Sequence, residues 1–361
     1  MRYKIIHLSR YLLILLFFAV FSFLFLIKGR ATANGVIEGL KICSGVVLPS
    51  LFPFTVLSVF MLKSGFFKAT EKYVNKLSNK IFKLSGSELS VFIISLIGGY
   101  PIGAKLINDM YEDNLINESR AKKLLLASIN GGPSFIIFTV GELILSNKNL
   151  GYVFFVSNLI TSLLFLLILF FKEKNYKSSD TKTIISNSVA DCFVLSVESA
   201  CKMFLNICGW IILFSGILSG ISAVLSGKSP FILLPLNLFL EITVGITKAK
   251  EFSMPIPMFS FLISFSGISG ICQIKACLKN LNISFKCILA SRIIHGIISS
   301  LITKTVLKLF PQPAYTLSNG ITPQFNGFNL NIATVFLMVL CVFYIIYLNK
   351  VFFSKMHLKK Q

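Results

Sequence analysis

Long apolar blocks separated by short basic connections restrict the folds open to this chain. An α-helix needs roughly 20 apolar residues to cross the hydrocarbon core of a bilayer. Uninterrupted blocks of about this length occupy 10–28, 44–62, 150–171, 204–226, 230–247 and 330–348. Further blocks reach it if a break or a buried polar residue is tolerated: 89–108, 123–145, 256–274 and 283–310. The sequence therefore predicts an all-α polytopic membrane protein with about eight to ten hydrophobic segments.

Composition supports a membrane protein over a soluble domain. Of the 361 residues, 55% are hydrophobic, and only 14% are charged. The formal net charge of +21 arises from 35 Lys and Arg against 14 Asp and Glu. These basic residues gather in the short connections between apolar blocks, where the positive-inside bias places them. The pattern indicates anionic membrane lipids as a partner and argues against nucleic acid.

The connections also predict the orientation of the chain. The stretch 63–83 alternates lysines with apolar residues at helical spacing, which indicates a surface amphipathic helix or a solvated loop packed on the bundle. The loop 311–329 carries no charge, whereas lysines follow the last apolar block. The positive-inside rule then places this loop outside and both termini in the cytoplasm of an integral protein of the cell membrane.

The first apolar block resembles a signal peptide, but Lys28-Gly29-Arg30 follows it directly, without a small-residue cleavage site. We predict a retained anchor. The predicted organisation is an N-terminal membrane anchor (1–30), a first repeat (31–171), a polar cytoplasmic linker (172–187), a second repeat (188–310), and a loop, last membrane helix and basic tail (311–361).

Two patches of the first half recur in the second half. FIISLIGGYP at 92–101 matches FLISFSGISG at 261–270, and KKLLLASIN at 122–130 matches FKCILASRI at 285–293. Because both patches recur in the same order, the sequence predicts two repeated halves with broken or re-entrant helices. Charge counting places both broken hairpins on one side of the membrane, whereas inverted repeats would place them on opposite sides.

The first break, GGYPIGAK at 98–105, is a candidate substrate site. Glycines let backbone approach a ligand closely, and a half-helix that begins here points its N–H groups at an anion. Lys105 adds a full positive charge. The alternative is that the small residues only let helices pack tightly. The candidate substrate-binding residues are Gly98, Gly99, Tyr100, Pro101, Gly103 and Lys105.

The second break, NGGP at 130–133, adds an amide side chain that both donates and accepts hydrogen bonds. A helix kink satisfied by a neighbouring serine is the alternative. Asn117, further upstream, is predicted to cap the start of a helix. The candidates here are Asn130, Gly131, Gly132 and Pro133, and their counterparts in the second copy are Ser266, Ser269 and Gln273.

Charged side chains at membrane depth are costly and therefore mark candidate functional positions. Glu241 lies within an apolar block and is a candidate for coupling a proton or sodium ion. Arg292 and His295 are three residues apart, so they share one helix face. Arg292 is predicted either to bind an anionic substrate or to pair with Glu241.

No motif in the sequence indicates an enzyme. There is no P-loop, Rossmann glycine fingerprint, HExxH or GxSxG. The eight cysteines include no CxxC pair, so neither a disulfide framework nor a metal site is expected. We expect no cofactor, no metal and no catalytic residue.

The residues around the breaks resemble those of the YlbJ-type sporulation integral membrane proteins, grouped with the nucleoside-recognition (Gate) membrane domains. The resemblance extends over about 35–310, and Gly98 and Gly131 depart from it, since the family usually has Ser there. The similar stretches are LFPFTVLSVFMLKSGF (51–66), GGYPIGAKLINDMYEDNLINESRAKKLLLASINGGPSFI (98–136), LEITVGI (240–246) and FSGISGICQ (265–273).

This resemblance implies a relation to concentrative nucleoside transporters and a role in sporulation. Its implied cargo is dipicolinic acid, moved across the outer forespore membrane. A pyridine dicarboxylate needs cationic groups, half-helix N-termini and a donor or acceptor for its ring nitrogen. These groups could be supplied by the two breaks, Lys105, Asn130 and Arg292. We therefore expect a secondary transporter of a small anionic metabolite. The alternatives are a nucleoside or related small-solute carrier, and a non-transporting membrane scaffold for spore assembly.

Overall fold

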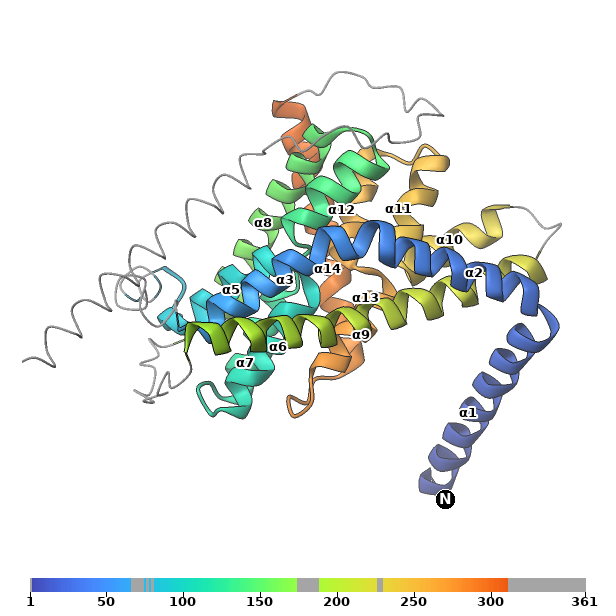
Figure 1. Cartoon of the computed structure of the whole chain (residues 1–361), viewed down its shortest axis with the longest axis horizontal. Helices are drawn as coiled ribbons and strands as arrows, with labels where there is room; N and C mark the ends of the chain where they lie inside the picture. Colours follow the sequence, from blue (N-terminus) through green and yellow to red (C-terminus); the bar gives the residue numbers. More distant parts are fainter. Residues whose placement is uncertain are drawn as a thin grey trace, which may run out of the picture. The chain divides into compact units, whose positions relative to one another are not determined.

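The computed structural model describes residues 2–65, 75, 78, 81–173, 188–225 and 230–310 (Figure 1). They all belong to one of the two units into which the chain divides, Met1–Leu317. The predictions for most of 63–83, for the linker and for 311–361 fall largely or wholly outside the described residues.

The helices are α1 (Arg2–Ile27), α2 (Gly29–Ile42), η1 (Cys43–Val47), α3 (Leu48–Lys63), α5 (Gly86–Gly98), α6 (Tyr100–Glu112), α7 (Glu118–Ser128), η2 (Ser134–Ile144), α8 (Lys148–Phe170), α9 (Val189–Val224), α10 (Pro230–Leu240), α11 (Ile242–Glu251), α12 (Ile256–Phe265), α13 (Gly267–Cys277) and α14 (Phe285–Leu309).

The predicted all-α membrane class is confirmed. Every regular element in the described ranges is helical. Within the part of the chain that the structure describes, five helical segments are long and apolar enough to cross a membrane: Gly29–Lys63, Lys148–Phe170, Val189–Val224, Ile256–Cys277 and Phe285–Leu309.

Two predicted blocks differ from the structure. The block 230–247 was expected to form one uninterrupted span, and this prediction was wrong. Glu241 adopts an extended backbone (φ −134°, ψ 128°) between α10 and α11, and its side chain caps α11. The block 204–226, predicted as a span of its own, instead joins the residues before it in one helix, α9, because no Pro interrupts them.

The run α2–η1–α3 packs along α9, and the two lie side by side in Figure 1. Glycines at four-residue spacing, Gly35 and Gly39 on α2 and Gly216 and Gly220 on α9, bring the backbones close. A methyl group added at Gly35 would lie 2.4 Å from the carbonyl oxygen of Ser215. This is the small-residue contact by which helices associate where no hydrophobic effect acts between them.

The variant Gly35→Leu is therefore expected to force α2 and α9 apart and to lower the stability by about 1–3 kcal/mol, the usual effect of overpacking. Thermal unfolding in detergent, followed by circular dichroism, measures this change. Gly209→Leu is the matched control, because Gly209 on α9 has no atom within 4 Å of an added methyl group. Equal melting temperatures for both variants would contradict the close packing.

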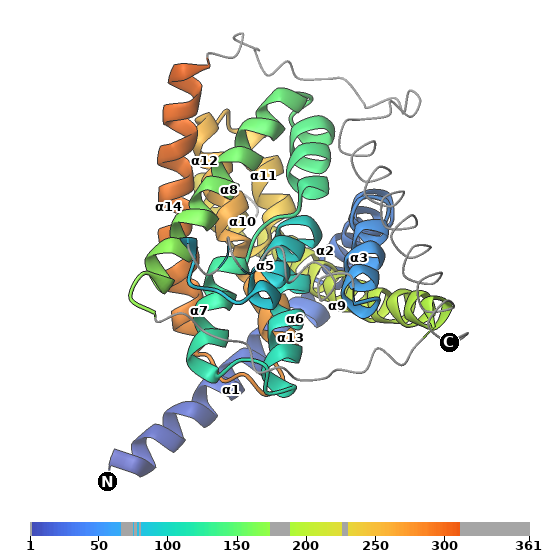
Figure 2. The same cartoon turned by 90° about the vertical axis from the view of Figure 1, so that its left-hand side faces the viewer.

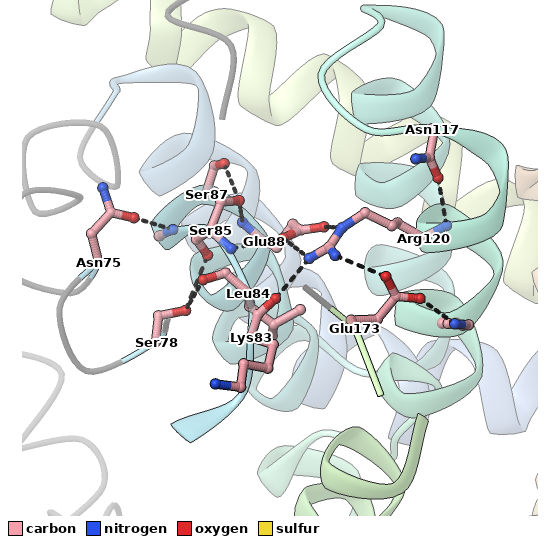
Figure 3. Close-up of polar contacts among 12 residues, drawn as sticks. Asn75, Ser78, Lys83, Leu84, Ser85, Ser87, Glu88, Asn117, Arg120 and Glu173 are labelled. Atoms are coloured by element: carbon pink, nitrogen blue, oxygen red, sulfur yellow. Dashed lines mark hydrogen bonds and ion pairs between the residues drawn. The ribbon is translucent and has the colours of Figure 1, made fainter. Parts of the chain in front are cut away.

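A buried ion pair joins α5 to α7 (Figure 3). The Arg120 guanidinium donates from Nε and Nη2 to the two carboxylate oxygens of Glu88, each at 2.7 Å. Nη2 also donates to the carbonyl oxygen of Lys83, and the guanidinium lies 5.1 Å from the centre of the Phe170 ring. Arg120 is 3% exposed and Glu88 fully buried. These contacts hold the first turns of α5 and α7 against the end of α8.

Both helices of this pair have the caps that their sequences encode. Ser85 and Glu88 form a capping box at the start of α5. The side chain of Asn117 accepts a hydrogen bond from the Arg120 amide at 2.9 Å, so the predicted N-cap of α7 is confirmed.

Glu173, just beyond α8, lies beside this group and is expected to make stability depend on pH. The hydrogen bond from Lys123 holds the pKa of the Glu173 carboxyl below its ordinary value of 4.5. A carboxyl with a lowered folded-state pKa stabilises the protein above its unfolded pKa, and this contribution is lost as pH falls through the folded pKa. Thermal unfolding between about pH 3 and pH 6 is expected to show a smaller acid-induced loss for Glu173→Gln than for the unmodified chain. Equal losses would contradict the pairing.

Candidate functional site

The first and second breaks cross one another with their backbones in contact. Gly99, between α5 and α6, has a φ of +89°, a conformation that favours glycine. A methyl group added at Gly99 would lie 3.2 Å from the amide nitrogen of Gly132. One added at Gly132 would lie 2.8 Å from the carbonyl oxygen of Ile97. Only glycines fit this approach, which we name the first crossing (97–99 with 130–132).

A second crossing joins the breaks at 240–242 and 266–267. Gly267, the first residue of α13, has a φ of +69°. A methyl group there would lie 3.1 Å from the amide nitrogen of Ile242 and 3.3 Å from the carbonyl oxygen of Leu240. The apolar sequence around Glu241 has no Gly or Pro at the break itself, so sequence analysis missed this interruption.

Side chains tie the two crossings together. The Tyr100 hydroxyl, at the start of α6, donates to the carbonyl oxygen of Ile263 in α12. Asn158 of α8 donates to the Ser264 hydroxyl at 3.2 Å. Both contacts join residues more than 100 positions apart in the sequence. The two crossings therefore form one connected unit.

A pocket opens between the crossings and the wall formed by η1, α3 and α9. Its volume is about 50 Å³, measured as the space open to the centre of a water molecule. At roughly 10–15 Å³ for one water, that is space for a few water molecules or a small polar group. It is lined by Val47, Leu51, Thr55, Gly98, Gly99, Tyr100, Pro101, Ile102, Gly132, Phe135, Ile207, Ile211, Glu241, Ile242, Thr243 and Gln273.

The pocket brings together about half of the residues that the sequence marks as candidates. Those that line it are Gly98, Gly99, Tyr100, Pro101, Gly132, Glu241 and Gln273. Those outside its lining are Gly103, Lys105, Asn130, Gly131, Pro133, Ser266, Ser269 and Arg292. Sequence analysis missed Thr55 and the apolar wall, although a hydroxyl within an apolar block, two residues after Pro53, is a usable signal for Thr55.

Glu241 is the carboxylate of the pocket. Its side chain is fully buried, and Oε2 accepts a hydrogen bond from the Val244 amide at 2.8 Å. Oε1 has no hydrogen-bond partner among the described residues. One oxygen is thus held by the first turn of α11, and the other is free to bind a proton or a ligand.

Arg292 is placed away from the pocket lining, at the end of α7. Its guanidinium donates to the carbonyl oxygens of Leu126 and Ile129. These groups belong to the last turn of α7, where the helix lacks its own donors, and a cation there is favoured by the helix dipole. Among the described residues, no ion pair joins Arg292 to Glu241. The geometry fits a cap for the second break.

The remaining polar candidates make contacts of their own. His295 shares the buried face of Arg292, as predicted, and its Nε2 lies 3.1 Å from the Ser162 hydroxyl. Ser162 in turn donates to the Asn130 side chain. Lys105 forms a half-exposed ion pair with Asp109 at 3.0 Å, one turn along α6. Asn130 is thus held at the second break, whereas the ion pair of Lys105 lies within α6.

Comparisons with known proteins agree with the membrane class. No family model matches the chain, and no solved structure matches it. The chain is similar to the sporulation integral membrane protein YlbJ of Bacillus subtilis (strain 168), with 24% identity over 345 aligned positions that cover 84% of each chain. Together with the five span-length helical segments, this similarity supports an integral membrane protein.

Proposed function

We propose that the chain is a secondary transporter that moves a small anionic metabolite, dipicolinic acid, across the outer forespore membrane during sporulation. One observation carries this proposal: two crossings of interrupted helices enclose a single pocket. Interrupted helices whose half-helix ends face a shared site are the binding architecture of many secondary transporters. Irregular backbone at membrane depth is tolerated where it lines such a cavity or is buried in protein.

The order of the helices supports two related halves. Among the described helices, each half has a long helical run, then two interrupted segments and a second long helix: α2–η1–α3, α5/α6, α7/η2, α8 and then α9, α10/α11, α12/α13, α14. The last helices, α8 and α14, run side by side in opposite directions (Figure 2). Aligned in this order, the break at Gly99 corresponds to the break at Glu241. The sequence match of 92–101 with 261–270 pairs different breaks. The opposite directions of α8 and α14 favour an inverted repeat.

The start of α6 supports an anionic group on the substrate. Gly99 precedes α6, no side chain caps the helix, and its first residues, Tyr100, Pro101 and Ile102, line the pocket. The backbone N–H groups of Tyr100 and Ile102 therefore have no side-chain acceptor, and Pro101 has no N–H. Such helix N-termini bind carboxylates and phosphates. A pyridine dicarboxylate supplies carboxylates for this position. The sporulation role rests on the similarity to the sporulation protein of Bacillus subtilis.

A nucleoside or related neutral solute is the second candidate. The observation that favours it is the absence of Lys, Arg and His from the described residues that line the pocket. Lys105 pairs with Asp109, and Arg292 caps α7. A neutral ligand needs no basic side chain, and Gln273, Thr55 and Thr243 offer hydrogen bonds.

The test is uptake of labelled dipicolinate by proteoliposomes that contain purified protein, with labelled uridine in parallel. Saturable dipicolinate uptake is the expected result. Uridine uptake alone would replace the proposal with the nucleoside carrier. Transport of neither solute, in vesicles of known orientation and with ion gradients imposed, would favour a non-transporting scaffold.

A further inference from the structure

We infer that Glu241 carries a proton together with the anion, so that the carboxyl is neutral while a carboxylate group of the substrate occupies the pocket and ionised after the substrate has left. This inference rests on the proposed function and adds the coupled ion and the residue that binds it. The proton is taken up from the side on which the anion enters, and it is released on the other side when the anion departs.

The two oxygens of Glu241 have different surroundings. The Val244 amide fixes Oε2 at 2.8 Å, so the side chain keeps one orientation at the start of α11. Oε1 is buried and has no hydrogen-bond partner among the described residues. An ionised oxygen that is buried without a partner costs more than the neutral acid, because burial disfavours the charged form. Oε1 is therefore the atom to which a proton adds.

The described lining offers Glu241 no basic side chain; the donors beside it are the backbone amides of the first turn of α11 and the Thr243 hydroxyl. Of the described lining residues, only Glu241 is a carboxylate and none is basic; Tyr100 of α6 is the other titratable one. The Cys43 thiol of η1 lies close enough to interact with the Glu241 charge. The lining contributed by α3, α9, η2 and α13 contains no titratable side chain. A counter-charge for an ionised Glu241 must come from α11 or from a bound ion.

An anion at the start of α6 and an ionised Glu241 would share this small pocket. Much of the lining is apolar, including Val47, Leu51, Phe135 and Ile211, so screening of like charges is weak. Two carboxylates that share a buried site do not both stay ionised. A proton on Oε1 removes the repulsion and converts an acceptor into an O–H donor for the substrate carboxylate.

The same lining favours a proton over a sodium ion. Metal cations of this kind are bound by several oxygen ligands, commonly including carbonyls of unwound helix ends. The side chains with oxygen that line the pocket with Glu241 are Thr55, Tyr100, Thr243 and Gln273, and Tyr100 already donates to Ile263. A proton needs a single oxygen, and Oε1 provides it.

The experiment measures dipicolinate uptake into proteoliposomes with and without an inward proton gradient, for the unmodified chain and for Glu241→Gln. Coupling to one proton is expected to raise the accumulation of dipicolinate about tenfold for each pH unit of gradient. Glutamine keeps the oxygen that accepts from Val244 but cannot exchange a proton. We expect Glu241→Gln to bind dipicolinate and to lose the response to the gradient. Glu251→Gln is the matched control, on the same helix but half-exposed and paired with Lys248.

A second measurement needs no variant. Calorimetric titration of the unmodified protein with dipicolinate, in two buffers of different ionisation enthalpy, is expected to show uptake of one proton for each anion bound. Binding without proton uptake, uptake driven only by a sodium gradient, or a gradient response retained in Glu241→Gln would overturn the inference and leave the transporter intact. No binding and no uptake of dipicolinate by the unmodified chain would overturn the proposed function and the inference together.

Discussion

Replacing Arg120 with alanine is expected to lower the stability of the protein by about 3–5 kcal/mol, the usual effect of removing one partner of a buried ion pair. Glu88, in the first turn of α5, would stay fully buried without a cation, and the contact of the guanidinium with the Phe170 ring would be lost. Since folded domains are stable by only about 5–15 kcal/mol, we expect much less folded protein in membranes. Thermal unfolding and the yield of membrane-inserted protein measure the effect.

The matched control for Arg120 is Lys122→Ala, two residues along α7. Lys122 pairs with Glu118 at 2.6 Å at the surface, where ion pairs contribute about 0–1 kcal/mol. Replacing Arg120 and Glu88 together by methionine is expected to recover part of the loss, because no buried charge is left unpaired. Equal melting temperatures for Arg120→Ala and Lys122→Ala would contradict the pair in Figure 3.

Replacing Arg292 with methionine is expected to have the second largest effect. The carbonyl oxygens of Leu126 and Ile129 would lose their donor inside the protein. Each buried carbonyl left without a partner costs about 1–3 kcal/mol, so the second break is expected to become disordered or shift. Thermal unfolding measures the loss, and Lys304→Met, at an exposed position of the same helix, is the control.

A conservative variant distinguishes a helix cap from a substrate ligand at Arg292. Arg292→Lys keeps one cation but cannot reach both carbonyl oxygens with a planar fork. If Arg292 is a cap, its melting temperature falls while the folded fraction binds dipicolinate with unchanged affinity. Lost affinity with unchanged melting would instead restore the sequence-based prediction that Arg292 binds the anion directly.

The sequence locates most of the interruptions because Gly and Pro at those points remove or weaken helical hydrogen bonds. The breaks at Gly99 and 130–133 were predicted in this way, and the helix start at Asn117 follows from its capping side chain. The break at Glu241 was missed because a carboxylate caps α11 there, and an isolated Glu in an apolar block carries no local signal for a break.

Site residues were harder to predict, since residue type alone does not say which polar group meets which. Lys105 and Arg292 have the chemistry that an anion needs, yet one pairs with Asp109 and the other with the end of α7. Glu241 and Gln273 do line the pocket. Which polar residues line the pocket depends on contacts between residues that are far apart along the chain.

The sequence by itself determined the membrane class of this protein. The length of an apolar block can be compared with the thickness of a bilayer without knowing where any other residue lies. The sequence also determined where glycine permits the backbone to break. Only the tertiary structure decided that the breaks cross in pairs, and that Glu241 faces the pocket while Arg292 does not. The physical reason is that a crossing joins backbones by close contact, and close contact between distant segments exists only after the helices have packed.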